Sequence, residues 1–161
     1  MEDPHVQRRR PRLIVVEGES DRVALETLAE KLGHERPEIA VLGGAHAIAS
    51  FVALAGNRNL VGLCDKNEEF LFRRVLDTVY ICDPDLEGEL IRALGTDRAL
   101  ELVDPSFATL QKQPAWRGMP LEDQLRRYLS GRSGNKLRYA RLFVDALEVI
   151  PAPLQGVLEE R

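Results

Sequence analysis

The chain has 161 residues, of which 44% are hydrophobic and 30% are charged, and its formal net charge is −4 at pH 7. This length suits one domain with a substantial hydrophobic core, and the composition is that of a soluble globular protein. No apolar run is long enough to span a membrane and no secretory signal peptide is recognisable, so we expect a cytoplasmic protein without membrane contact. The two cysteines, Cys64 and Cys82, lack the spacing of a zinc site or of a disulfide framework, and we expect small buried thiols.

Charge is distributed unevenly along the chain. Residues 65–104 contain eleven Asp or Glu against five Lys or Arg, a local charge of −6, whereas residues 111–141 contain eight Lys or Arg against two Asp or Glu, a local charge of +6. An acidic segment followed by a basic one suits an enzyme that binds both metal ions and a polyanion. Solvated helix faces produce the same asymmetry, so charge alone leaves both interpretations open.

The first strong structural signal is an apolar run at residues 13–16, before which residues 1–11 form a basic segment that we expect to be flexible. Four consecutive apolar residues are typical of a strand that is buried on both faces. A helix follows, with Glu19 or Ser20 as its expected cap and an apolar stripe from Val23 to Leu32.

Three further strands are predicted, and each is followed by a helix. The strands lie at 39–42, 60–64 and 79–82, and the helices at 45–55, 70–75 and 86–94. Strands that alternate with helices indicate an α/β fold with a mostly parallel sheet and helices on both faces. Right-handed crossovers then place the carboxyl end of every strand at the same edge of the sheet.

The last part of the chain has a less regular pattern. We predict a further strand at 99–103, a loop at 111–120, a helix at 121–129, a polar link at 130–135, a helix at 136–150 and a short helical tail. The expected organisation is therefore a flexible basic segment at 1–11, an α/β core at 12–110, and a basic, mainly helical C-terminal extension at 111–161 that completes the same domain.

Three of the predicted strands end on a carboxylate. Glu17 follows the first strand, Asp65 the third and Asp83 the fourth, so a parallel sheet would gather them at the edge where open α/β folds bind ligands. Asp21 lies one helical turn beyond Glu17, on the same face. Because facing carboxylates repel one another unless a cation lies between them, this grouping favours a Mg²⁺ or Mn²⁺ site. The alternative is that each acid caps its own helix independently.

These residues resemble the motifs of a TOPRIM domain, and the resemblance covers nearly the whole chain from Arg12 onward. The glutamate after the first strand of such domains is matched by Glu17. Their Asp-x-Asp after the third strand is matched by Asp65-Lys66-Asn67, in which asparagine replaces the second aspartate. The resemblance implies a TOPRIM-like Rossmannoid fold.

The chain is most similar to the TOPRIM portion of OLD-family (overcoming lysogenization defect) endonucleases. The acid one turn past the glutamate is matched by Asp21, the later acidic cluster by Asp83, Asp85 and Glu87, and a late lysine by Lys136. This resemblance implies a nuclease that hydrolyses or nicks DNA with two Mg²⁺ or Mn²⁺ ions.

The resemblance also implies roles for individual residues, with Glu17, Asp65 and Lys136 as the catalytic set. One ion would be held by Glu17, Asp65 and Asn67, and the other by Asp21, Asp83 and either Asp85 or Glu87. Lys136 would neutralise the charge that develops on the phosphate. The alternative is that Lys136 is a surface lysine at the start of a helix. Asn67 contributes no charge, and Glu68 or Glu69 could compensate for it.

DNA is the expected partner, with RNA as an alternative. The predicted nucleic-acid-binding residues are Gly43, Gly44, Lys112, Arg117, Arg132, Lys136 and Arg138. The Gly-Gly turn either brings backbone amides close to a phosphate or is a tight strand-to-helix connection.

OLD proteins fuse this module to an ATPase, but no GxxxxGK[ST] phosphate loop occurs in this sequence. An ATPase would therefore have to be a separate partner protein. The alternative function is a catalytically weak nucleic-acid-binding or regulatory module that acts with such a partner. A receiver-like α/β domain is a third possibility, which leaves the late basic segment unexplained.

Overall fold

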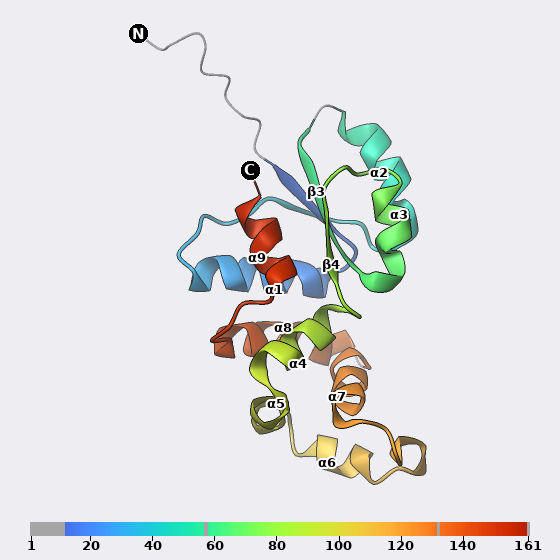
Figure 1. Ribbon diagram of the computed structural model, residues 1–161, viewed down its shortest axis with the longest axis vertical. Helices are drawn as coiled ribbons and strands as arrows, with labels where there is room; N and C mark the ends of the chain where they lie inside the picture. Colours follow the sequence, from blue (N-terminus) through green and yellow to red (C-terminus); the bar gives the residue numbers. More distant parts are fainter. Residues whose placement is uncertain (1–11, 57, 132, 161) are drawn as a thin grey trace.

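The centre of the molecule is a parallel sheet (Figure 1). The computed structural model describes residues 12–56, 58–131 and 133–160. Within these ranges the strands are β1 (Leu13–Val16), β2 (Ile39–Val41), β3 (Leu60–Asp65) and β4 (Val79–Cys82). Their spatial order is β2-β1-β3-β4, and every neighbouring pair is parallel. The four predicted strands and the parallel sheet are confirmed, whereas the expected flexible segment at 1–11 lies outside the described residues.

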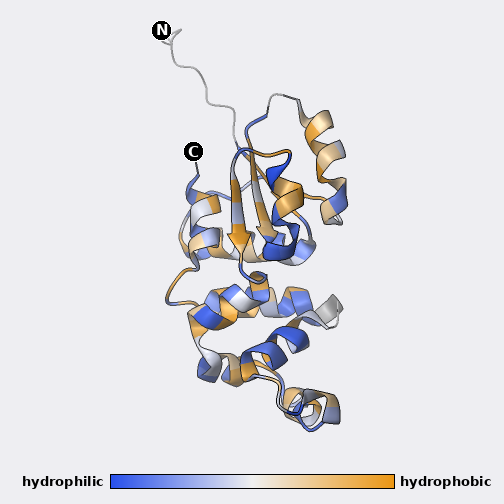
Figure 2. Cartoon of the chain, turned by 45° about the vertical axis from the view of Figure 1, so that its right-hand side comes forward, coloured by the Kyte–Doolittle hydropathy of each residue, from blue (hydrophilic) through white to orange (hydrophobic). Residues whose placement is uncertain are grey.

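Alternate residues of β1 pack into two different hydrophobic clusters. Ile14 and Val16 belong to the larger cluster, and Val15 between them belongs to the smaller one. Successive side chains of a strand point to opposite faces of a sheet, so the two clusters lie on opposite faces. All of β1 is buried, and orange hydrophobic segments run through the strands in Figure 2. The predicted burial on both faces is confirmed.

The helices divide between the two faces of the sheet and a layer beyond it. They are α1 (Glu19–Lys31), α2 (Ile48–Ala55), α3 (Glu69–Arg73), α4 (Leu86–Leu94), α5 (Thr96–Leu102), α6 (Ser106–Gln111), α7 (Leu121–Ser130), α8 (Ser133–Ala146) and α9 (Ala152–Glu159), with short 3₁₀ helices η1 (Ala45–Ala47), η2 (Lys66–Glu68) and η3 (Pro114–Trp116). Helices α1 and α9 cover one face, and α2 and α3 cover the other (Figure 1). None of the helices within the described ranges combines the length and the hydrophobicity needed to cross a membrane.

Helices α4 to α8 form a helical layer beyond the carboxyl end of β4, and α9 returns to the sheet (Figure 1). Rings of the layer pack edge to face, with centroids 5.3 Å apart for Phe107 and Tyr128 and 5.8 Å apart for Tyr139 and Phe143. Leu63 of β3 belongs to the same hydrophobic cluster as these side chains. The carboxyl edge of the sheet therefore faces a layer that shares its core.

The predicted strand at 99–103 is wrong, because α5 occupies Thr96–Leu102. Its short, mainly apolar sequence is compatible with a strand, but Ala99 is buried in the helical layer, where no strand is available for pairing among the described residues. Helix α6 was not predicted, and η3 interrupts the predicted loop. The last long helix begins at Ser133 and ends at Ala146, so it takes up part of the predicted polar link and stops before Ile150.

The two cysteines are free and buried, as predicted. Burial, together with the neighbouring charge of Asp65, raises the pKa of the Cys64 thiol to about 12. Both side chains therefore pack as small neutral groups.

Candidate metal centre at the carboxyl edge of the sheet

The edge triad consists of Glu17, Asp65 and Glu68. Glu17 follows β1, Asp65 is the last residue of β3, and Glu68 is the last residue of η2. One carboxylate oxygen from each residue lies within 4.8 Å of the other two. The parallel pairing of β1 with β3, which sets Val16 opposite Leu63, brings these strand ends side by side. The sequence-based grouping of Glu17 with Asp65 is therefore what the fold produces.

Glu68 completes this group of carboxylates. Asn67 is exposed, whereas Glu68 is half-buried. Among the described residues, the Oε2 atom of Glu68 is buried and has no hydrogen-bond partner. Burial, and then the charge of Glu17, raises the pKa of Glu68. An uncompensated buried carboxylate oxygen is costly unless a cation lies next to it, so the triad fits a divalent metal ion.

The inner pair consists of Asp21 and Glu87, in the first turns of α1 and α4. Oδ2 of Asp21 accepts a hydrogen bond from the Gly18 backbone N–H at 3.1 Å. Gly18 is the cap residue of α1, so the prediction of Glu19 or Ser20 as the cap was wrong. The helix therefore begins directly after Gly18, and Glu19 and Ser20 both lie in its first turn.

Burial raises the pKa of both carboxylates of the inner pair. The pKa of Asp21 is raised to about 7, first by burial and then by the charge of Glu87, against the hydrogen bond from Gly18. Glu87 is buried, and burial raises its pKa as well. These groups resist ionisation unless positive charge is brought close to them.

Asp65 experiences the charges of the edge triad and of the inner pair. Burial, and then the charges of Asp21 and Glu87, raises its pKa to about 8. Its Oδ1 accepts a hydrogen bond from the Leu86 backbone N–H at 3.2 Å, which ties the end of β3 to the start of α4. Glu17, Asp21, Asp65, Glu68 and Glu87 thus form one acidic region in which a cation would relieve the repulsion.

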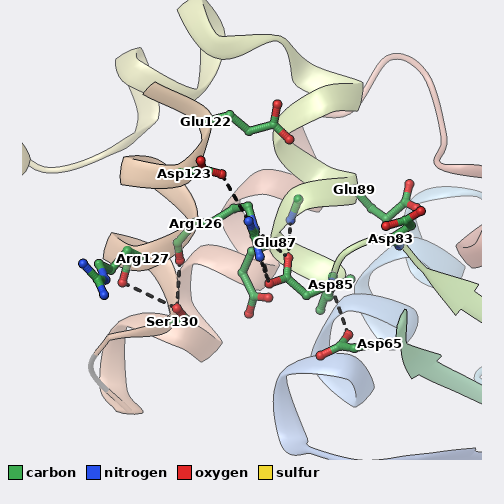
Figure 3. Close-up of polar contacts among 12 residues, drawn as sticks. Asp65, Asp83, Asp85, Glu87, Glu89, Glu122, Asp123, Arg126, Arg127 and Ser130 are labelled. Atoms are coloured by element: carbon green, nitrogen blue, oxygen red, sulfur yellow. Dashed lines mark hydrogen bonds and ion pairs between the residues drawn. The ribbon is translucent and has the colours of Figure 1, made fainter. Parts of the chain in front are cut away.

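Asp83 and Asp85 have other surroundings (Figure 3). Asp83 is exposed and lies beside Glu89, whose Oε1 accepts its backbone N–H at 3.0 Å. Oδ1 of Asp85 accepts the Gly88 backbone N–H at 2.8 Å and so caps α4. Oδ2 of Asp85 lies 2.9 Å from Nη2 of Arg126 on α7. Of the four acids predicted for the second ion, the fold brings together Asp21 and Glu87. Asp85 is paired with Arg126, and its charge still raises the pKa of Glu87 and of Asp65, whereas Asp83 lies exposed beside Glu89.

Lys136 reaches this region from the first turn of α8. Its Nζ lies 3.8 Å from Oε1 of Glu87. Its charge lowers the pKa of both Asp21 and Glu87 and so opposes the effect of burial. The late lysine therefore lies beside the inner pair, on the side of the helical layer.

The Gly-Gly turn lies at the same edge, directly after β2. Gly43 and Gly44 have φ angles of 75° and 152°, which glycine adopts without strain. The backbone N–H of Gly43 donates to the carbonyl oxygen of Glu17 at 2.9 Å, so this amide is already used within the fold. That contact agrees with the tight-connection interpretation of this turn.

The other predicted nucleic-acid-binding residues are spread over the helical layer. Lys112 and Arg117 are exposed after α6 and η3, at the end of the layer far from the sheet (Figure 1). Arg138 forms an ion pair with Asp104. Arg132 lies outside the described residues.

Arg126 was not among the predicted site residues, yet it forms an ion pair with one of them, Asp85. It lies three residues after Asp123 on α7, and its Nη1 is 3.2 Å from Oδ1 of that acid. The spacing of Asp123 and Arg126 in the sequence indicates a local ion pair on the helix. The contact with Asp85, which is distant in sequence, depends on the packing of α7 against α4.

No protein-family model and no curated protein matches the sequence. Solved structures do match in fold. The C-terminal region of the Burkholderia pseudomallei OLD protein has a TM-score of 0.66 at 19% identity, over 93% of this chain and 96% of that chain. The C-terminal region of the Xanthomonas campestris pv. campestris OLD protein also has a TM-score of 0.66, at 20% identity, over 93% of each chain. The chain therefore has the α/β fold of OLD C-terminal regions, as the resemblance implied.

Proposed function

We propose that this protein is a metal-dependent nuclease that hydrolyses or nicks DNA. The fold shared with the C-terminal regions of OLD proteins supports a nuclease-type domain. So does the resemblance of its motifs to those of OLD-family endonucleases. The single observation that carries the proposal is the edge triad, in which Glu68 has a buried oxygen without a partner among the residues described.

The proposed cofactors are two Mg²⁺ or Mn²⁺ ions. The edge triad would hold the first ion and the inner pair the second, and Asp65 carries its charge close to both. A donor set made of carboxylate oxygens suits these hard cations. When bound, such a pair of ions activates water for attack and stabilises the departing oxygen of a phosphodiester.

In this proposal the residues of the chain bind the ions and orient the phosphate. The partly exposed Lys136 would place a positive charge against a non-bridging phosphate oxygen. The exposed cations Lys112 and Arg117 of the helical layer would make backbone contacts that do not read the base sequence. Gly43, Gly44, Arg132 and Arg138 remain part of the proposed nucleic-acid surface, and DNA is proposed ahead of RNA.

The test is cleavage of supercoiled plasmid in the presence of Mn²⁺ or Mg²⁺. We expect nicking by the wild type, and a loss of at least about 100-fold in rate for Glu17→Gln, because an amide oxygen replaces a charged ligand. Glu148→Gln, at an exposed glutamate after α8, is the matched control and should cleave like the wild type. Wild-type protein that binds Mn²⁺ but cleaves neither plasmid nor linear or single-stranded DNA would overturn the nuclease assignment.

That last outcome is what the second candidate function predicts. A catalytically weak nucleic-acid-binding or regulatory module, acting with a separate ATPase, is the alternative that the asparagine at position 67 of the TOPRIM pattern indicates, although Glu68 supplies a carboxylate at this edge. Such a module would bind metal and DNA and would show little or no cleavage by itself.

A further inference from the structure

Arg126 makes the most extensive side-chain contact between the helical layer and the region of the acids (Figure 3). Its Nη2 lies 2.9 Å from Oδ2 of Asp85, and its Nε donates to both Asp85 oxygens at 3.2 and 3.3 Å. Nη1 contacts Asp123 at 3.2 Å. Only 29% of the Arg126 side chain and 23% of the Asp85 side chain are exposed. Forked contacts of this kind hold both partners in a defined orientation.

Asp85 passes this constraint on to the start of α4. Its Oδ1 accepts the Gly88 N–H at 2.8 Å and closes the first helical turn. The next residue, Leu86, donates its N–H to Oδ1 of Asp65. On the other side of the turn, the Lys66 N–H donates to the carbonyl oxygen of Pro84 at 3.1 Å. The turn at 84–88 is therefore held both by α7 and by the end of β3.

Two residues of the proposed metal centre depend on this turn. Glu87 lies within it, between the capping Asp85 and the Gly88 N–H that the cap binds. Asp65 is oriented by the hydrogen bond from Leu86. Arg126 forms no hydrogen bond or ion pair with either carboxylate in the described structure, so it can orient them only through Asp85, although its charge also lowers the pKa of Glu87 directly.

Asp85 could serve either as a metal ligand or as a structural bridge to Arg126, and its contacts favour the bridge. Both of its carboxylate oxygens are engaged by Arg126, and one also accepts the Gly88 N–H. A metal ion at Asp85 would have to compete with the Arg126 guanidinium for Oδ2, or with both the guanidinium and the helix cap for Oδ1. Arg126 in turn is neutralised by Asp85 and Asp123, which makes it a poor receptor for a phosphate.

We propose that Arg126 is a positioning residue for the metal centre and that Asp85 is its bridge and not a metal ligand. The pair forms a clamp that holds Glu87 and Asp65 in the orientation in which they bind cations. This inference rests on the proposed function, since it concerns the same metal centre. It predicts that metal affinity depends on a side chain that touches neither the ions nor the substrate.

The two roles of Asp85 predict opposite effects for Arg126→Ala. If Asp85 were a ligand, the arginine would compete with the metal, and its removal would tighten Mn²⁺ binding. If the pair is a clamp, removal of the arginine loosens the turn and weakens Mn²⁺ binding. The sign of the change therefore separates them without any measurement of cleavage.

The experiment is calorimetric titration of the full chain with Mn²⁺. We expect Arg126→Ala and Asp85→Ala each to weaken binding by about tenfold or more. The double variant should be no weaker than the worse single variant, because both remove the same link. Arg126→Lys should recover part of the affinity, and Asp85→Asn, which keeps a capping oxygen, should lose less than Asp85→Ala. The exposed neighbour Arg127→Ala is the control and should bind like the wild type.

Thermal unfolding shows whether each variant is folded. If Arg126→Ala is unfolded, the comparison of Mn²⁺ affinities is made with Arg126→Lys and Asp85→Asn instead. Tighter or unchanged Mn²⁺ binding by the arginine variants overturns the clamp. So does the loss of one whole binding event in Asp85→Asn. Wild-type protein that binds no Mn²⁺ overturns the proposed function, and the clamp with it. The two failures are thus distinguished by the wild-type titration.

Discussion

The edge triad and the turn at 84–88 both contain acids close behind a strand, yet their carboxylates end up in opposite situations. Glu68 of the triad has a buried oxygen that no described residue contacts, and Asp65 is repelled by its neighbours. Asp85 of the turn has Arg126 and a helix N-terminus as partners. Acids of similar sequence context therefore differ in function according to which positive groups reach them.

The largest effect is expected within the edge triad. Glu68→Gln should weaken the binding of one Mn²⁺ ion by about 100-fold, because the amide keeps the shape of the side chain but removes its charge. The measurement is calorimetric titration, with Glu148→Gln as the matched control. If Glu68→Gln binds both ions like the wild type, Glu68 is no ligand and the triad must be redrawn.

The next effect concerns the stability of the metal-free protein against pH. The folded pKa of Asp65 is about 8, above its ordinary value of 3.8, so the folded state binds the proton more tightly than the unfolded state. Stability should therefore fall as the pH rises from about 4 to about 8. Asp21, with a folded pKa of about 7, adds to the fall in the same direction.

Asp65→Asn should remove much of this loss and make the metal-free protein about 2 kcal/mol more stable than the wild type at pH 9. Urea unfolding in the presence of a chelator at pH 5 and pH 9 provides the measurement. Asp97→Asn, at an exposed acid of α5, is the control and should follow the wild type at both values. A wild-type stability that is the same at pH 5 and pH 9 contradicts the repulsion.

Removal of an acid from the turn at 84–88 should lower the stability of the metal-free protein, opposite to the effect of Asp65→Asn. Asp85→Ala should destabilise the metal-free protein by about 1–2 kcal/mol at neutral pH, because α4 loses its cap and Arg126 loses its main partner. Urea unfolding measures this change, with Asp83→Ala as the exposed neighbour for comparison. Stabilisation by Asp85→Ala would mean that Asp85, like Asp65, is an uncompensated charge.

The smallest effect is expected at Asn67. Asn67→Asp restores the aspartate of the TOPRIM pattern, but the side chain is exposed while Glu68 completes the triad. We expect a change in Mn²⁺ affinity of no more than about twofold. An improvement of tenfold or more would show that position 67 is a ligand position and that its asparagine weakens the site.

Much of the fold was predictable because its signals are local. Four consecutive apolar residues before Glu17 indicated a doubly buried strand, and the regular alternation of strands and helices indicated a parallel sheet. The strand predicted at 99–103 was wrong because a short, mainly apolar run fits a strand and a helix equally well. Its surroundings in the helical layer decided for the helix.

Part of the candidate site was also predictable from local signals. Parallel topology alone groups Glu17 with Asp65, and helical spacing brings Asp21 close to them. The choice of Glu68 over Asn67 depends on how η2 turns after β3, and no pattern in the sequence encodes that turn. The compensation of the Asp85 charge depends on Arg126, which lies 41 residues away from Asp85 in sequence.

The sheet, the edge at which the acids meet and the types of residue available there follow from the amino-acid sequence alone. Hydrophobic periodicity shows which face of each strand or helix is buried, and the handedness of crossovers sets the direction of the strands, so neither needs contacts between distant side chains. The tertiary structure decided which carboxylates are compensated and which are not. That outcome depends on contacts between distant segments, because the charge state of a buried acid follows from what is packed against it.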